Sequence, residues 1–210
     1  MNISREHIIK ALEKKLPGPE SHRKMIPPHR DLHAPEKEKS KLKKSSVLLL
    51  LFEEKKELKI CLIKRPAHMK HHASQVAFPG GRIEKGETAL QTAFRETEEE
   101  IGVTSEKIEI LGSLSELYVG VSGFLIHPYV GWLHAEPKFV TCDDEVEKTI
   151  LFPLLKYQNK TEMTELETVA GKLTVPAVHF EGETIWGATL MILAEFYDVI
   201  NKVQSPKNKF

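Results

Sequence analysis

The segment RETEEE, residues 95–100, concentrates carboxylates that could together hold a metal ion. A helix turns by about 100° per residue, so Glu96, Glu99 and Glu100 would share a wedge of about 100° that points away from the apolar face. Like charges at this spacing repel one another, and either solvent or a hard cation such as Mg²⁺ or Mn²⁺ relieves that repulsion. Charge alone therefore leaves two interpretations open, a solvated acidic helix and a metal site.

The residues on both sides of this segment favour the metal site. Gly80 and Gly81 form a pair that lets the backbone approach a ligand closely, so a carbonyl there could face the carboxylates. Arg95 falls beside the acidic wedge and is predicted to pair with Glu87, which would fix the loop before the helix. Gly102 predicts a left-handed end of the helix. Together these features predict a loop–helix–loop unit that carries a carboxylate cluster.

The pattern from Gly81 to Val103 resembles the signature of the Nudix hydrolases, G-x5-E-x7-R-E-U-x-E-E-x-G-U with U aliphatic. Every charged and glycine position matches. Thr97 stands where the family prefers an aliphatic residue, and because it lies on the expected core face it should affect packing more than chemistry. The resemblance implies the α/β (α+β) class, with an α/β/α sandwich, a mixed sheet and a loop–helix–loop catalytic unit.

The resemblance also implies a reaction, the hydrolysis of a diphosphate linked to another moiety with the help of Mg²⁺ or Mn²⁺. The implied metal ligands are Glu96, Glu99, Glu100 and the backbone of Gly81, with Glu99 shared between ligand and base roles. The implied catalytic and orienting residues are Glu99, Glu96, Arg95, Glu87 and Glu145.

Glu145 enters through a later loop. The segment CDDEVEKTILFPL, residues 142–154, looks like the Glu-Val element that precedes a strand in the family. Glu145 is therefore a candidate for an additional metal ligand or base. The alternative, an acid of a solvated loop, stays equally open.

The residues upstream of the acidic helix bear on the substrate. The segment CLIKRPAHMKHHASQVAFPGG, residues 61–81, is similar to the extended motif of the coenzyme A diphosphatase branch, and residues 121–132 and 185–196 also resemble that branch. Three positions depart from the motif, since Lys70 replaces an arginine, Ser74 replaces a glycine and Pro66 replaces a small residue. The implied substrate-binding residues are Arg65, Lys70, Phe78 and Gly80.

The resemblance thus implies a hydrolase that cleaves coenzyme A or acyl-coenzyme A into 3′,5′-ADP and 4′-phosphopantetheine or its acyl form. Arg65 and Lys70 would form a cationic patch for the phosphates, whereas the alternative is that Arg65 only ends a strand at the surface. Two other functions stay open. One is hydrolysis of another nucleoside diphosphate derivative, such as ADP-ribose or a dinucleotide, and the other is non-catalytic ligand binding on a Nudix fold.

The hydrophobic pattern predicts the elements that must position these residues. A helix over 3–16 is followed by a polar, basic arm over 19–44, and then by a hairpin of strands 46–52 and 58–64. A short apolar piece at 76–78 precedes the acidic helix over 88–101. Further strands are expected at 108–114, 125–133, 149–151 and 175–180, with a closing helix over 186–199. The expected organisation is an N-terminal helix and arm over 1–44, one domain over 45–200 and a tail over 201–210.

The composition limits the partners. Lysine plus arginine equals aspartate plus glutamate, at 30 each, so no global field draws the chain to nucleic acid or to a membrane surface. The longest apolar run, Val47 to Phe52, is too short to span a bilayer. Cys61 and Cys142 match no metal or redox spacing and are expected to be buried strand thiols, which makes the cytoplasm the default location. The expected partner is a small coenzyme A-like molecule, and a homodimer stays open.

Overall fold

The computed structural model of the chain describes residues 3–26, 32, 42–69, 72–168 and 171–202. Its helices are α1 (Arg5–Leu12), α2 (Pro19–His22), α3 (Ala89–Ile101) and α4 (Gly187–Lys202), with the 3₁₀ turns η1 (Arg23–Met25), η3 (Ser105–Lys107) and η4 (Leu154–Tyr157). Its strands are β1 (Lys43–Glu54), β2 (Glu57–Lys64), β3 (Val76–Ala77), β4 (Gly80–Arg82), β5 (Ile108–Ser113), β6 (Leu117–Val119), β7 (Phe124–Leu133), β8 (Lys148–Pro153), β9 (Glu162–Thr168), β10 (Gly171–Phe180) and β11 (Glu183–Trp186).

The main sheet is mixed. Its central path runs β3-β2-β1-β7-β5, while β4 pairs with β1, β6 with β7 and β8 with β2. β1 and β7 are parallel, and the remaining pairs are antiparallel. A second, antiparallel sheet has the order β11-β10-β9.

The apolar run in β1 explains why this strand is central. Leu48 to Phe52 are all fully buried, which is typical of a strand covered on both faces. Successive side chains of a strand point to opposite faces. Leu49 and Leu51 therefore join the core beneath α1 and α4, and Leu48, Leu50 and Phe52 join the core beneath α3.

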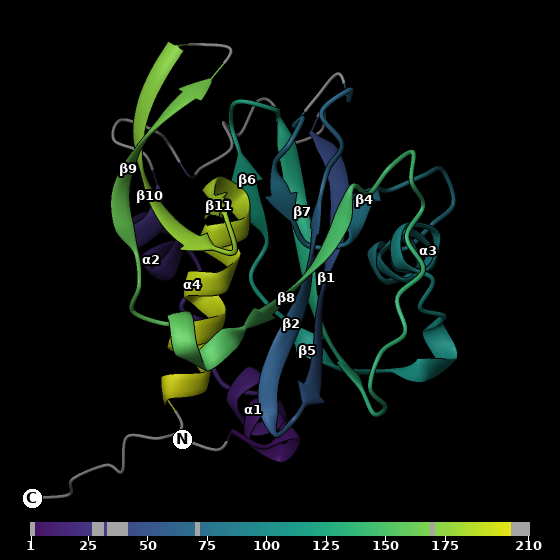
Figure 1. Cartoon of the computed structure of the whole chain (residues 1–210). Coiled ribbons are helices and arrows are strands. Elements are labelled where there is room, and N and C mark those ends of the chain that lie inside the picture. The colour runs from purple at the N-terminus through teal and green to yellow at the C-terminus, as the bar shows by residue number, and fades with distance from the viewer. Residues whose placement is uncertain (1–2, 27–31, 33–41, 70–71, 169–170, 203–210) are drawn as a thin grey trace, which may run out of the picture.

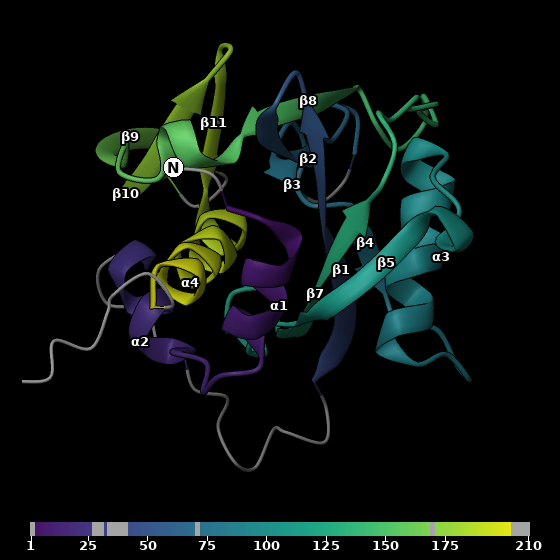
Figure 2. The same cartoon turned by 90° about the horizontal axis from the view of Figure 1, so that it is seen from below.

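The main sheet lies between two helical layers. In Figures 1 and 2, α3 covers one face, and α1, α2 and α4 lie on the other together with the second sheet. The predicted α/β/α arrangement with a mixed sheet is confirmed. Of the α-helices in the described residues, α3 is the one on this face, where its polar side remains available for a site.

Most predicted elements are confirmed within a few residues, including the hairpin of β1 and β2, the acidic helix α3 and the closing helix α4. The first helix is shorter than predicted, since α1 ends at Leu12 rather than at residue 16. The sequence reading missed β4, β6, β9 and β11. These strands are short or, in β9, mostly polar, so their apolar pattern is weak.

The predicted polar arm from residue 19 is wrong in part, since residues 19–25 form α2 and η1, although four of their side chains are exposed. α2 and η1 pack against α4, and Ser21 and His22 are buried. The physical reason is a set of polar partners on α4, which satisfies these side chains away from water. The lysine-rich end of the predicted arm covers residues 37–44, and residues 37–41 of it lie outside the described residues. The boundary at residue 44 stays a prediction.

The two cysteines differ. Cys61 is a fully buried thiol in β2, as predicted, and burial raises its pKa. Cys142 was expected in a strand but lies half-buried in the loop before β8, where the turn that leads to Glu145 begins. Among the described residues, no helix has both the length and the apolar character needed to cross a bilayer.

Candidate metal centre

Local sequence fixes both ends of α3. Thr88 caps the first turn, with its hydroxyl accepting from the backbone N–H of Gln91 while the Gln91 side chain accepts from the backbone N–H of Thr88. This reciprocal capping box satisfies two amides that a helix start leaves free. Gly102 ends the helix in the left-handed conformation, with φ at 70°, as its position predicts.

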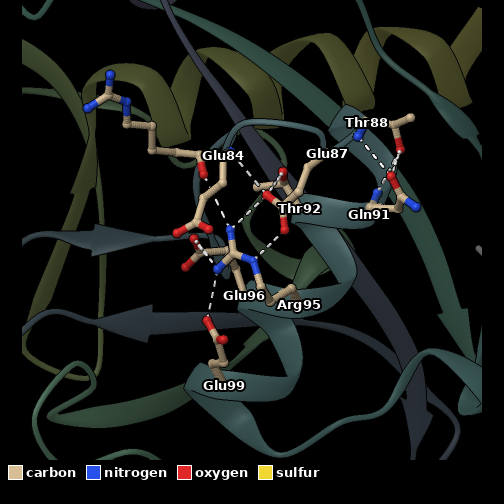
Figure 3. A network of polar contacts seen from close by, with 9 residues as sticks. Glu84, Glu87, Thr88, Gln91, Thr92, Arg95, Glu96 and Glu99 are labelled. Carbon is tan, nitrogen blue, oxygen red and sulfur yellow. Dashed lines mark hydrogen bonds and ion pairs between the residues drawn. The ribbon is translucent and has the colours of Figure 1, made fainter.

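Arg95 braces the loop before α3 (Figure 3). Its Nε and Nη2 donate to the two carboxylate oxygens of Glu87, at 2.7 and 3.1 Å. Thr92 donates its hydroxyl to the same carboxylate at 2.7 Å. These bonds, led by those from Arg95, lower the pKa of Glu87 to about 2. The predicted Arg95–Glu87 pair is confirmed, and Thr92 is a member of this brace that the sequence reading missed.

Three carboxylates converge beside α3. One oxygen each from Glu96, Glu100 and Glu145 all lie within 4.8 Å of one another. Glu145, whose role the sequence left open, reaches this group because its loop is tied to the end of α3. The backbone N–H of Cys142 donates to the carbonyl of Glu100, and that of Glu145 donates back to Cys142.

Glu100 is the buried member of this carboxylate cluster. Its side chain is only 1% exposed, so it does not point into solvent as the predicted wedge implied. The backbone N–H of Gly80 donates to Glu100 Oε2 at 2.9 Å, and Nη1 of Arg65 lies 3.7 Å from Oε1. Burial, with the nearby charges of Glu96 and Glu145 adding to it, raises the pKa of Glu100 to about 8. Burial also raises the pKa of Glu96.

The cluster fits a divalent cation. All its side-chain donors are carboxylate oxygens, which hard cations such as Mg²⁺ and Mn²⁺ prefer. A buried carboxylate among like charges costs free energy unless a cation balances it, and the raised pKa of Glu100 is the mark of that cost. The structure thus gathers Glu96 and Glu100 with Glu145, the loop acid for which the sequence left a ligand role open.

Glu99 stands apart from this cluster. Its side chain is 54% exposed, and its carboxylate accepts from Nη1 of Arg95 at 2.9 Å, the same nitrogen that donates to Glu96 (Figure 3). The structure therefore holds Glu99 at the exposed edge of the Arg95 guanidinium, beside Glu96. Its assignment as ligand or base stays a prediction.

The two glycines of the preceding loop have separate roles. Gly80 directs its N–H to Glu100, and an added Cβ would overlap the backbone of β1. At Gly81 an added Cβ would overlap the carboxylate of Glu96. Glu96 can therefore lie against the backbone only because residue 81 has no side chain.

The predicted substrate-binding residues differ in their position relative to the carboxylate cluster. Arg65 lies at the carboxylate cluster through Glu100. Phe78 is 3% exposed and packs in the core shared with α4, which leaves little of its ring open to a substrate. Lys70 lies outside the described residues. The Arg65–Glu100 contact had no local signal, because the two residues are far apart in the sequence.

The protein-family model described as the NUDIX domain matches residues 42–170, well over half of the chain. The chain belongs to the Nudix family. As a Nudix pyrophosphohydrolase, it acts on nucleoside diphosphate derivatives, and Nudix hydrolases generally use divalent metal ions.

Related proteins agree with the family, and solved structures agree with the fold. Nudix hydrolase 3 of Caenorhabditis elegans is 31% identical over 68% of this chain and 67% of its own length. The uncharacterized Nudix hydrolase NudL of Pectobacterium atrosepticum is 33% identical over 64% and 71%, respectively. The structure of a mutT/nudix family protein from Listeria innocua matches with a TM-score of 0.53 and 20% identity, covering 81% of this chain and 97% of that one. RenU, a Nudix hydrolase from M. smegmatis, has a TM-score of 0.52 and 15% identity, over 80% and 90%.

Replacing Gly81 by alanine is expected to lower kcat/KM by about 10- to 100-fold, because the methyl group would displace the Glu96 carboxylate. The stability should change little, since that carboxylate ends a flexible side chain and the φ angle of Gly81 is not in the left-handed region. Kinetics with Mn²⁺ and thermal unfolding would measure both effects. The matched control is Gly120→Ala, whose Cβ would have an ordinary contact with Tyr118. Equal kinetics for the two variants would contradict the expected role of Gly81.

Proposed function

We propose that this Nudix hydrolase cleaves the diphosphate of coenzyme A or an acyl-coenzyme A, with Mg²⁺ or Mn²⁺, and releases 3′,5′-ADP and 4′-phosphopantetheine or its acyl form. The observation that carries the proposal is the position of Arg65. This residue fills the first arginine position of the coenzyme A diphosphatase motif, and its guanidinium lies beside Glu100 of the carboxylate cluster.

The loop that follows Arg65 also supports the proposal. Arg65 and the end of the loop are joined by two backbone hydrogen bonds, from Arg65 N to Gln75 O and from Ser74 N to Arg65 O. Ser74 has a φ of 58°, in the left-handed region that glycine adopts most easily. The motif has glycine at this position, so the serine departs in type but keeps a backbone conformation that suits glycine.

The proposed roles follow from the contacts. Glu96, Glu100 and Glu145 would hold the cation, which supplies charge neutralisation for the diphosphate and activation of water when bound. Gly80 holds one oxygen of Glu100, and Gly81 leaves room for Glu96. Arg95, fixed by Glu87, orients Glu96 through its Nη1 at 2.9 Å. Arg65 would contact the phosphates, since a guanidinium can donate two parallel hydrogen bonds to them.

A panel of substrates tests the proposal. The full chain with Mn²⁺ or Mg²⁺ is expected to release 3′,5′-ADP from coenzyme A, as measured by chromatography of the products. Dephospho-coenzyme A, which lacks the 3′-phosphate, should be cleaved with a higher KM. Faster cleavage of ADP-ribose or of a dinucleotide would replace the substrate assignment by the alternative. Ligand binding without cleavage of any member would favour the non-catalytic alternative.

A further inference from the structure

Arg65 is incompletely satisfied where it stands. It follows β2 directly, and its side chain is 24% exposed. Among the residues that the structure describes, Glu100 is its one ion-pair partner, at 3.7 Å. Its Nε is buried and donates no hydrogen bond there. The guanidinium therefore faces the buried carboxyl group of Glu100 without a full set of hydrogen bonds to the described residues.

The two oxygens of Glu100 have different surroundings. Oε2 accepts the N–H of Gly80 at 2.9 Å. Oε1 accepts no backbone N–H from the described part of the chain and faces Nη1 of Arg65. The carboxylate of Glu100 also belongs to the cluster with Glu96 and Glu145. A guanidinium and a divalent cation thus compete for the same buried carboxylate.

We infer that Arg65 is the cationic partner of Glu100 in the metal-free protein, and that a divalent ion takes its place and makes its guanidinium available to the diphosphate of the substrate. A divalent ion and a guanidinium that contact the same carboxylate repel each other. The divalent ion carries the larger charge, so it is the one that the carboxylate cluster retains. The metal half of this inference rests on the Arg65–Glu100 contact and on the carboxylate cluster, and is independent of the substrate. The substrate half rests on the proposed function.

The backbone of Arg65 is fixed, so only its side chain can move when a divalent ion takes its place beside Glu100. The N–H and the carbonyl of Arg65 are both held, by Gln75 O at 3.0 Å and by Ser74 N at 3.1 Å. The Nε of Arg65 loses no hydrogen bond when the guanidinium moves, since it makes none with the described residues. The guanidinium can therefore turn from Glu100 toward a bound anion about a fixed Cα.

Calorimetric titration of Mn²⁺ into the metal-free full chain, without substrate, tests the metal half. Arg65→Gln is expected to bind Mn²⁺ about three- to tenfold more tightly, because it removes the competing charge. Lys148→Gln is the matched control, since it removes one positive charge from a residue that pairs with Glu183 instead, and its affinity should stay within about twofold of the original. Equal or weaker Mn²⁺ binding by Arg65→Gln would overturn the inference.

Arg65→Lys separates the two halves. It keeps the positive charge but not the planar fork, so its Mn²⁺ affinity should match the original chain while its KM for coenzyme A rises about tenfold. Mn²⁺ affinity raised as much as in Arg65→Gln would contradict the exchange of charges. If coenzyme A is not cleaved at all, the proposed function and the substrate half fail together, whereas the calorimetric result still decides the metal half.

Discussion

Replacing Glu100 by glutamine is expected to reduce kcat by about three orders of magnitude, which corresponds to ~4 kcal/mol of transition-state stabilisation. Glu100 is the buried member of the carboxylate cluster, and one of its oxygens is held by Gly80 N at 2.9 Å. Glutamine has nearly the same shape and keeps an oxygen for that N–H, but it is neutral and a poor ligand for a hard cation. The loss should therefore fall on metal binding and not on the fold.

Two measurements check this expectation. Mn²⁺ should raise the unfolding temperature of the original chain but not that of Glu100→Gln, because only binding to the native state stabilises it. Without metal, the variant should be at least as stable, since it replaces a carboxyl group that burial disfavours as an anion by a neutral amide of nearly the same shape. The matched control is Glu98→Gln on the exposed side of the same helix, which should keep the original rate. A Glu100→Gln enzyme with an unchanged rate would exclude Glu100 as a metal ligand.

The acidic helix was predictable because its determinants are local. The apolar spacing places Ala93, Thr97 and Ile101 in the core, and all three are fully buried. Thr97 also shows why its departure from the family pattern is tolerated, since its hydroxyl donates to the carbonyl of Ala93 one turn earlier, at 2.7 Å. The brace between Arg95 and Glu87 likewise follows from their spacing of eight residues along one loop and helix.

The parts that failed depend on distant partners. The burial of Glu100 is set by Gly80 and Arg65, which precede it by whole elements. His22 belongs to a segment that reads as polar and exposed, yet it is buried because Glu195 lies opposite it, 173 residues later. A polar residue that is buried against a polar partner adds nothing to the apolar periodicity of its segment. The hydrophobic pattern therefore predicts that it is exposed to solvent.

Replacing Glu195 by alanine is expected to lower the free energy of unfolding by about 3–5 kcal/mol. The side chain of Glu195 is fully buried in α4. One of its oxygens accepts the backbone N–H groups of Gly18 and Ser115, at 3.0 and 3.3 Å. The other lies 2.9 Å from Nε2 of His22, which is itself only 2% exposed. Alanine would leave the buried groups of Gly18 and His22, and the partly buried N–H of Ser115, without their acceptor.

The residue one turn further along α4 offers the matched control. Asp198 accepts from Ser21 Oγ and from Lys24 Nζ, at 2.5 and 2.6 Å, but its side chain is 29% exposed. Water can replace an acceptor at that depth, so Asp198→Ala should cost about 1 kcal/mol. Chemical denaturation measures the free energy of unfolding of both variants. An equal decrease in the two would show that the burial of Glu195 adds nothing to its contribution to stability.

The hydrogen bonds of Glu195 form a clamp between α4 and the N-terminal residues 18–22. The segments that lose protection from hydrogen exchange distinguish loss of this clamp from destabilisation of the whole domain. Glu195 joins the N-terminal residues 18–22 and the segment between β5 and β6 to α4, and both 3–26 and α4 lie outside the residues that the family model matches. Hydrogen exchange in Glu195→Ala should therefore rise first in α1 and α2, while α3 keeps its protection. Glu195→Gln keeps the size and one oxygen, so it should show a smaller increase in the same segment. A uniform rise across α3 and the main sheet would contradict this clamp, because it would mean that the N-terminal helices unfold only with the whole domain.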